Sequence, residues 1–254
     1  MLTNSLVPCN GRFPLLIALI SAFFIGGATS LSASLAAAIL LTLFILLSIA
    51  ATFLASRLLS STLLRGEASA FTLELPPYRT PQFGKVLVRS LLDRTLYVLG
   101  RAVISAIPAG ALIWCMANLH IGGDSILNIA SRVLDPIAAF IGLDGVILMA
   151  FILALPANEI VIPIIIMAYT AKGSLTDYSS LIELKELFVS NGWTATTAIC
   201  TMLFSLFHWP CATTILTIKK ESGSIKWTIS AILIPTAIGI LLCATVNAIS
   251  MLIG

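Results

Sequence analysis

A carboxylate stands inside one of the most apolar stretches of the chain. Glu159 lies next to Asn158 within the run GVILMAFILALPANEIVIPIIIMAY (145–169). A charged side chain at bilayer depth costs about 2.5 to 3.5 kcal/mol on insertion scales, so it normally faces a cavity or a partner. Pro156 and Pro163 flank the pair, and broken helices are tolerated in membranes where the freed carbonyls line a binding site. We therefore predict a functional site at a broken helix here.

Two cysteines share a second kind of local context. Pro8-Cys9 and Pro210-Cys211 are the two Pro-Cys dipeptides of the sequence. Each proline lies at the edge of an apolar segment or inside one, and paired interruptions in corresponding parts of a transporter point to its substrate site. The competing interpretation is that small, buried cysteines simply follow prolines that kink helices.

A histidine completes the set of groups that could hold an ion. His208 stands three residues before Cys211 in LFHWPCATT (206–214), which puts the two side chains on neighbouring turns if the helix continues. An imidazole, a thiolate and a carboxylate at membrane depth suit a borderline divalent transition metal, and they suit Mg²⁺ or Ca²⁺ poorly. The alternative role for His208 is a hydrogen bond between helices.

The composition predicts an integral membrane protein rather than a soluble domain. Hydrophobic residues make up 59% of the 254 residues, charged residues 10%, and the mean hydropathy is +1.07. The apolar stretches approach the roughly 20 residues that a helix needs to cross a bilayer, which favours an all-α fold over a β-barrel. A net charge of +3 gives no reason to expect a nucleic-acid partner.

Six transmembrane helices are expected from these stretches, at 13–31, 34–56, 101–119, 137–155, 193–217 and 227–252. The segment 158–170 is too short to cross alone, so we expect it to pair with the preceding span as a broken or re-entrant helix. The whole chain, 1–254, is predicted to form a single polytopic membrane domain. Three cysteines are expected only to pack within the apolar helices, namely Cys115, Cys200 and Cys243.

The polar stretch 57–100 carries more basic than acidic residues, which places it in the cytoplasm. Within it, the prolines of ELPPYRTP (74–81) predict an extended elbow. Apolar and charged residues then alternate at helical spacing over 82–99, which predicts an amphipathic helix on the inner membrane surface. A plain solvated linker helix explains the same pattern equally well.

The remaining loops give a consistent topology under one condition. The lysine-rich turn 219–226 is expected in the cytoplasm, whereas the balanced loops 120–135 and 171–192 are expected on the outer side. These assignments agree only if 158–170 returns toward the outer side. The pair Asn158-Glu159 is therefore predicted to form a turn within the membrane.

Missing motifs exclude several enzyme classes. The chain contains no G-x-x-x-x-G-K-[ST] loop, no H-E-x-x-H and no G-x-S-x-G, which leaves no support for P-loop nucleotide hydrolysis or for a hydrolase with these motifs. We expect a transporter rather than an enzyme.

Four segments resemble the membrane domain of one family, the bacterial ferrous iron transporter FeoB. They are TNSLVPCNGRFPLL (3–16), FTLELPPYR (71–79), LPANEIVIPIIIMAY (155–169) and FHWPCATTILTIKKESGSIKW (207–227). They follow one another in the family's order and extend over nearly the whole chain.

The resemblance implies an Fe²⁺ permease of the bacterial inner membrane, with iron as the transported ion and no permanently bound cofactor. Its two gate segments contain the Pro-Cys motifs, so Cys9 and Cys211 become expected iron ligands or pore-lining gates. Glu159 would supply negative charge, and Asn158 and His208 would be secondary donors.

Complete members of the family begin with a cytoplasmic G-protein domain, which is not found in this sequence. The resemblance therefore implies a C-terminal piece or split subunit that works with the GTPase-containing part in trans. FeoA and further copies of the chain are additional expected partners.

Two other functions remain open at this point. A nucleoside or organic-solute carrier would use Asn158 and Glu159 to hydrogen-bond its substrate and would not need cysteines. A membrane subunit that only assembles with a larger permease would not transport by itself.

Overall fold

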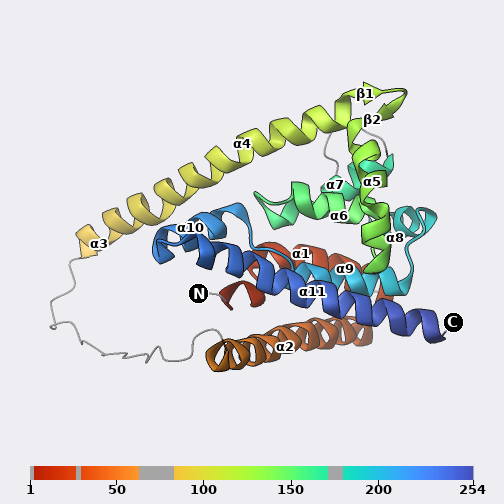
Figure 1. The fold of residues 1–254 in the computed structure, drawn as a ribbon, viewed down its shortest axis with the longest axis horizontal. Coiled ribbons are helices and arrows are strands. Elements are labelled where there is room, and N and C mark those ends of the chain that lie inside the picture. The colour runs from red at the N-terminus through yellow and green to blue at the C-terminus, as the bar shows by residue number, and fades with distance from the viewer. Residues whose placement is uncertain (1–2, 27–29, 63–82, 171–179, 254) are drawn as a thin grey trace.

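The computed structural model describes residues 3–26, 30–62, 83–170 and 180–253, and most of them are helical (Figure 1). The described strands are β1 (His120–Ile121) and β2 (Asp124–Ser125), which form a short antiparallel ribbon. The lysine-bearing α10 (Ala212–Ser222) and the short α3 (Phe83–Arg89) lie toward one end of the molecule. The ribbon and α8 (Leu181–Ser190) lie toward the other end.

Among the described residues, four helical segments are long and apolar enough to cross a membrane. They are Asn4–Phe24, Leu31–Ser61 (α2), Ala195–Ser222 and Ile225–Leu252, the last within α11 (Ile225–Ile253). A bent pair of helices raises the number to five. The all-α membrane fold is thus confirmed, whereas the six predicted crossings are not.

The predicted span 137–155 is wrong as a continuous helix. It is divided between α5 (Ile126–Phe140) and α6 (Gly145–Leu153), which meet at an angle of 108°. Gly142 takes a left-handed φ of 73° at the bend, which glycine adopts without a steric penalty. Asp144 then caps α6 by accepting a hydrogen bond of 2.6 Å from Ile147 N. A turn and a cap therefore interrupt the apolar run.

Two predicted loops also contain helices. Most of 120–135 belongs to α5, which Ser125 starts by accepting from Asn128 N at 3.3 Å. Within 171–192, the described residues include α8, capped in the same way by Ser180. Charged and polar residues on the exposed faces of these helices make the segments read as loops in the sequence.

The crossing of α5 over α6 depends on a missing side chain. A Cβ atom at Gly145 would lie 1.9 Å from Ser131 O and 2.6 Å from Asp135 Oδ1. Gly145 N also donates to Asp135 Oδ1 at 2.6 Å, so the two helices cannot separate without losing this bond.

The change Gly145→Ala is accordingly expected to lower the melting temperature of the detergent-purified protein. Forcing extra atoms into a packed contact typically costs about 1 to 3 kcal/mol. Gly110→Ala is the matched control, because Gly110 lies within α4 and a Cβ there meets open space. Helix propensity predicts that this control is neutral or stabilising. Equal melting temperatures for both variants would contradict the packing argument.

The helices α6 and α7 (Val161–Thr170) form a hairpin. Tyr169 near the end of α7 donates a hydrogen bond to Asp144 at the start of α6, and Trp193 Nε1 donates to Tyr169 Oη at 2.8 Å. The chain therefore reverses over 154–160, while the predicted position of this turn within a membrane stays a prediction. Pairing the two ends of the hairpin fixes the position of its tip, which carries Asn158 and Glu159.

The helix α4 (Tyr97–Asn118) continues directly from α3 through a π-helical stretch, Ser90–Leu96. The predicted amphipathic segment 82–99 is thus helical from Phe83 onward and does not separate from the following span. Its position on a membrane surface stays a prediction. The elbow predicted at 74–81 lies outside the described residues.

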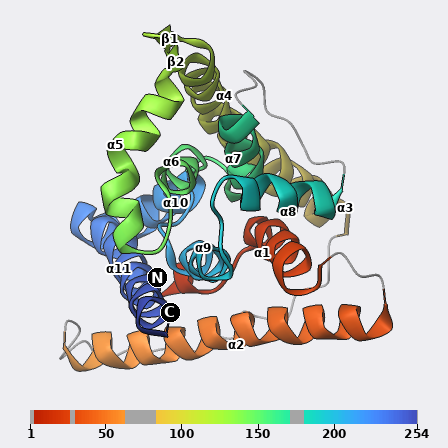
Figure 2. The same cartoon turned by 90° about the vertical axis from the view of Figure 1, so that its right-hand side faces the viewer.

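The core forms between α6, α7, α8 and α9 (Ala195–Phe207), around side chains such as Phe151 of α6, Phe188 of α8, and Phe204 and Phe207 of α9. In contrast, α2 lies across one side of the bundle (Figure 2) and buries little of its surface. Its apolar side chains face outward, as lipid-facing side chains do. Ser48 of α2 is buried and donates to Leu6 O, which attaches the first segment of the chain to this helix.

Candidate functional site

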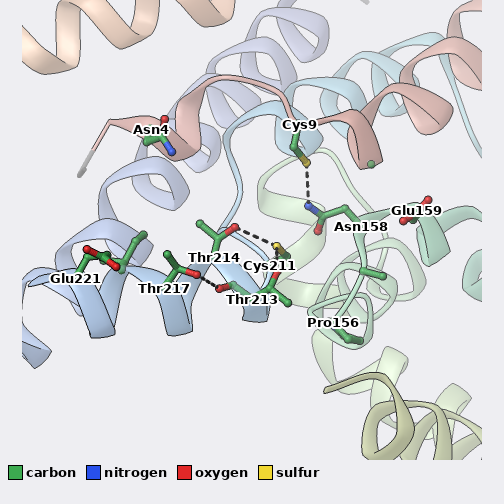
Figure 3. Close-up of a pocket in the computed structure, with 13 residues that line it drawn as sticks. Asn4, Cys9, Pro156, Asn158, Glu159, Cys211, Thr213, Thr214, Thr217 and Glu221 are labelled. Carbon is green, nitrogen blue, oxygen red and sulfur yellow. Dashed lines mark hydrogen bonds between the residues drawn. The ribbon is translucent and has the colours of Figure 1, made fainter. Parts of the chain in front are cut away.

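A pocket of about 800 Å³ opens between segments that are far apart in the sequence (Figure 3). The first segment of the chain, the tip of the α6–α7 hairpin and α10 each contribute to its wall. The lining residues are Asn4, Cys9, Gly11, Pro156, Ala157, Asn158, Glu159, Cys211, Thr213, Thr214, Thr217, Ile218 and Glu221. Four of the five predicted site residues are therefore brought together, and His208 is not among them.

Three helical segments begin at this pocket. Cys9 precedes the 3₁₀ turn Asn10–Arg12 that leads into α1 (Phe13–Leu19), and Cys211 is the N-cap of α10. The 3₁₀ turn Asn158–Ile160 leads into α7 in the same way. Starting turns present free N–H groups and a partial positive charge. The arrangement places both pocket thiols at helix starts.

The prolines explain why the helices begin where they do. Pro8 and Pro210 each precede a cysteine in extended backbone, with ψ of 166° at Cys9 and 160° at Cys211. Pro156 precedes Ala157, which is extended as well. Proline lacks the N–H that would continue a helix.

Pro163 is a correction to the sequence analysis. It was expected to break a helix, but it lies in the first turn of α7. The N–H groups of a first turn have no partner within the helix, so a proline is tolerated there. The interruption lies before it, at 154–160.

Asn158 connects two of the predicted site residues. Its Nδ2 donates to Cys9 Sγ at 3.8 Å, and His208 Nε2 lies 3.3 Å from its Oδ1. His208 itself is 1% exposed, and its Nδ1 contacts Phe204 O and Ser205 O. The imidazole therefore reaches the pocket only through the amide of Asn158, as a supporting group rather than a lining one.

Cys211 has hydroxyl partners that the sequence analysis missed. Its Sγ lies 3.1 Å from Thr213 Oγ1 and 3.2 Å from Thr214 Oγ1. The run CATT that follows Pro210 supplies both the thiol and its hydroxyl partners.

Arg12 is a second residue that the sequence analysis did not include. It is 2% exposed, and its Nη1 donates to Leu206 O at 2.5 Å and to Ser5 O at 3.1 Å. In an uninterrupted helix, Leu206 O would accept from residue 210, which is a proline without an N–H. Arg12 supplies the missing donor, and a positive charge also suits the carbonyl end of α9.

The same guanidinium extends to the interruption itself, because Arg12 Nη2 donates to His208 O at 3.3 Å. The segment that carries Cys9 is thereby attached to the segment that leads to Cys211. A hydrogen bond from Ala212 N to Leu155 O at 2.8 Å also joins the start of α10 to the α6–α7 hairpin. Backbone groups that one interruption leaves without a helical partner are thus paired with groups from another interrupted segment.

Glu159 is exposed on the pocket side of the hairpin tip. A Cβ atom at Gly11 would lie 3.9 Å from both Glu159 Cγ and Asn158 Cβ, so the Cys9 segment approaches the tip closely. Among the described residues, no group of three or more His, Cys, Asp and Glu side chains is positioned to hold a metal ion. The pocket thus offers two thiols, with the Glu159 carboxylate at one end and the Glu221 carboxylate at the other, rather than a preformed metal centre.

The other cysteines lie away from the pocket. Cys115 is exposed on α4, whereas Cys200 and Cys243 are buried, with Cys243 Sγ donating to Cys200 O at 3.2 Å. The packing role expected for Cys200 and Cys243 agrees with their burial, whereas the same expectation for Cys115 is wrong, because its side chain is exposed.

Two family models match the sequence. One, described as ferrous iron transport protein B C terminus, covers residues 41–93. The other, a gate domain described as nucleoside recognition, covers residues 99–225. The second match alone extends over half of the chain.

Several curated relatives of the chain are also named as ferrous iron transport proteins. The chain is 26% identical over 238 residues to an Fe(2+) transporter FeoB of Staphylococcus aureus, and 25% identical over 252 residues to one of Leptospira interrogans. The alignments cover 89% of this chain, and 32% and 35% of those proteins. A Porphyromonas gingivalis protein, named a fusion of Fe(2+) transport protein A and Fe(2+) transporter FeoB, is 24% identical over 92% of this chain and 32% of its own length. The chain spans about a third of the length of these relatives. No solved structure matches it.

Proposed function

The chain belongs to the FeoB family of ferrous iron transport proteins, and on that premise we propose that it carries Fe²⁺ across the membrane through the pocket at Cys9 and Cys211. One observation supports this proposal above the others. Two thiols that are 202 positions apart in the sequence line the same cavity at interruptions of apolar helices, where transporters bind their substrates.

The chemistry of the pocket suits a ferrous ion in transit. Thiolate sulfur binds softer and borderline divalent metals in preference to Mg²⁺ or Ca²⁺. Thr213 and Thr214 place their hydroxyl groups within hydrogen-bond distance of the Cys211 sulfur. Asn158 holds Cys9, and Glu159 adds negative charge to the wall. Conduction requires ligands that offset dehydration but still release the ion, and a few exchangeable ligands meet both conditions.

The topology of the proposed transporter follows from the basic segments. The end that bears α10 and α3 would face the cytoplasm of a bacterial inner membrane. The α6–α7 hairpin would then enter from the outer side and return to it as a re-entrant loop. The relatives are about three times longer than this chain, so we propose that a GTPase-containing part of the transporter works with it. The fused relative suggests Fe(2+) transport protein A as another partner, and we further propose an oligomer.

Replacing the thiols tests the proposal directly. In proteoliposomes that hold this chain with the GTPase-containing part, Cys9→Ser and Cys211→Ser are each expected to lower Fe²⁺ flux by at least about tenfold, the scale at which even supporting partners affect metal sites. Glu159→Gln is expected to lower flux less, because it removes charge without removing a thiol. Cys115→Ser is the control, since Cys115 lies on an exposed face of α4. Unchanged flux in the three pocket variants would contradict the site.

A second function is supported by two observations. The gate model is described as nucleoside recognition, and about 800 Å³ lies within the size range of sites for small organic molecules. Such a carrier would hydrogen-bond its substrate through Asn158 and Glu159. Nucleoside binding that survives both cysteine replacements and the addition of chelators would favour this function over iron transport.

A further inference from the structure

The pocket extends well beyond the two cysteines. Its wall follows α10 through Thr214, Thr217, Ile218 and Glu221, which recur at the spacing of one helix face. At about 1.5 Å rise per residue, Cys211 and Glu221 lie roughly 15 Å apart along the axis. Figure 3 shows Glu221, Thr217 and the Cys211 group in sequence along this wall. A single ion at the thiols would therefore leave the far end of the pocket unoccupied.

The acidic and basic residues of α10 lie on different faces of the helix. All three charged residues of α10 are exposed, but Glu221, the helix's single acidic residue, lines the pocket, whereas Lys219 and Lys220 do not. A carboxylate in the last turn of a helix is unfavourable, because the carbonyl end carries a partial negative charge. Among the described residues, the structure gives Glu221 no ion pair. Helix stability consequently offers no reason for an acid at this position.

The first segment of the chain completes this end of the pocket. Asn4 lines it as well, and Figure 3 places Asn4 and Glu221 at the end opposite Glu159. A carboxylate, an amide and the Thr217 hydroxyl are oxygen ligands, which suit harder divalent cations. The end with Cys9 and Cys211 offers sulfur instead.

We propose that Glu221, with Asn4 and Thr217, forms a second cation site at the lysine-bearing end of the pocket. The role of this site rests on the proposed function. A divalent ion passes between the thiols and an oxygen-lined site, and occupancy of two neighbouring weak sites promotes release. The cysteine site offers sulfur ligands and the Glu221 site offers oxygen ligands, so binding at each site can be measured with a different metal ion.

Two probe metals separate the sites in the purified full chain. Mn²⁺, which prefers oxygen ligands, is followed by the loss of its free electron paramagnetic resonance signal. Cd²⁺ is followed by thiolate-to-metal absorption in the ultraviolet. Glu221→Gln is expected to weaken Mn²⁺ binding by at least about tenfold, since even an outer-shell partner typically contributes that much. Its Cd²⁺ absorption should be retained. Glu186→Gln is the control, because Glu186 is an exposed acid on α8 outside the pocket.

The outcomes distinguish this site from the cysteine site. Equal Mn²⁺ affinity in wild type, Glu221→Gln and Glu186→Gln would overturn the second site, whatever the cysteines do. A loss of Mn²⁺ binding in Glu221→Gln, with Cd²⁺ absorption unchanged, would establish it. Cd²⁺ absorption that survives Cys9→Ser and Cys211→Ser would instead overturn the thiol site, and the Mn²⁺ result would stand by itself.

Discussion

Replacing Arg12 by methionine is expected to abolish most Fe²⁺ flux while lowering the melting temperature only moderately. Each buried acceptor left without a donor costs about 1 to 3 kcal/mol, and Arg12 serves Ser5 O, Leu206 O and His208 O. Removing a buried charge also recovers several kcal/mol of desolvation, so the net change in stability is small. The effect on Fe²⁺ flux is expected to be larger than the effect on stability, because the attachment between the two cysteine segments is lost.

The expected flux loss is about hundredfold, the scale at which displacing reactive groups by about 1 Å impairs an enzyme site. Arg12→Lys should be intermediate, because an ammonium group keeps the charge but lacks the planar fork that reaches several acceptors. Arg132→Met is the control: Arg132 pairs with Asp124 at 2.7 Å with its side chain 68% exposed, and such pairs contribute about 0 to 1 kcal/mol. Normal flux in Arg12→Met would refute the attachment role.

Pro210→Ala is expected to make the protein more stable and less active. Alanine at 210 restores the N–H that an α-helix would direct at Leu206 O, where Arg12 now binds. An interior proline costs a helix about 3 kcal/mol or more, so the residues from Ala195 to Ser222 gain by closing into one helix. Cys211 would then leave its N-cap position, and its thiol would turn away from the pocket.

The measurements are the melting temperature in detergent and Fe²⁺ flux in proteoliposomes, with flux expected to fall by about tenfold or more. Pro235→Ala is the matched control, because Pro235 lies within α11, which is continuous through it. Such a trade-off between stability and activity is typical of strained functional sites. A Pro210→Ala protein that transports normally would mean that the break is not needed.

The sequence was sufficient to predict the elements of the site but not all of their contacts. Cys9, Asn158, Glu159 and Cys211 were recognisable because polar or thiol groups beside prolines are unusual in apolar runs. Proline alone was a poorer guide, since Pro163 and Pro235 both lie inside helices. Whether a proline interrupts a helix depends on whether another segment satisfies the carbonyl that it leaves free, and this is a tertiary property.

Arg12 and Glu221 show which contacts of the site could not be predicted from the sequence. The sequence indicates that Leu206 O needs an external donor, but it does not say that Arg12, 194 positions away, supplies it. Glu221 looked like one charge of a cytoplasmic turn, although its spacing from Thr214 and Thr217 was a readable signal of a shared face. The bend before α6 was hidden by a continuous apolar run, in which only Gly142 and Asp144 mark the turn and the cap.

The bond from Ala212 N to Leu155 O gives the pocket a cooperative character. It joins the hairpin tip to α10, and Arg12 joins the first segment to the end of α9. A rearrangement at one interruption therefore removes a hydrogen bond from another. The pocket is therefore expected to switch in an all-or-none manner, so that a mechanical pull applied to the first segment is transmitted to all three helix starts at once.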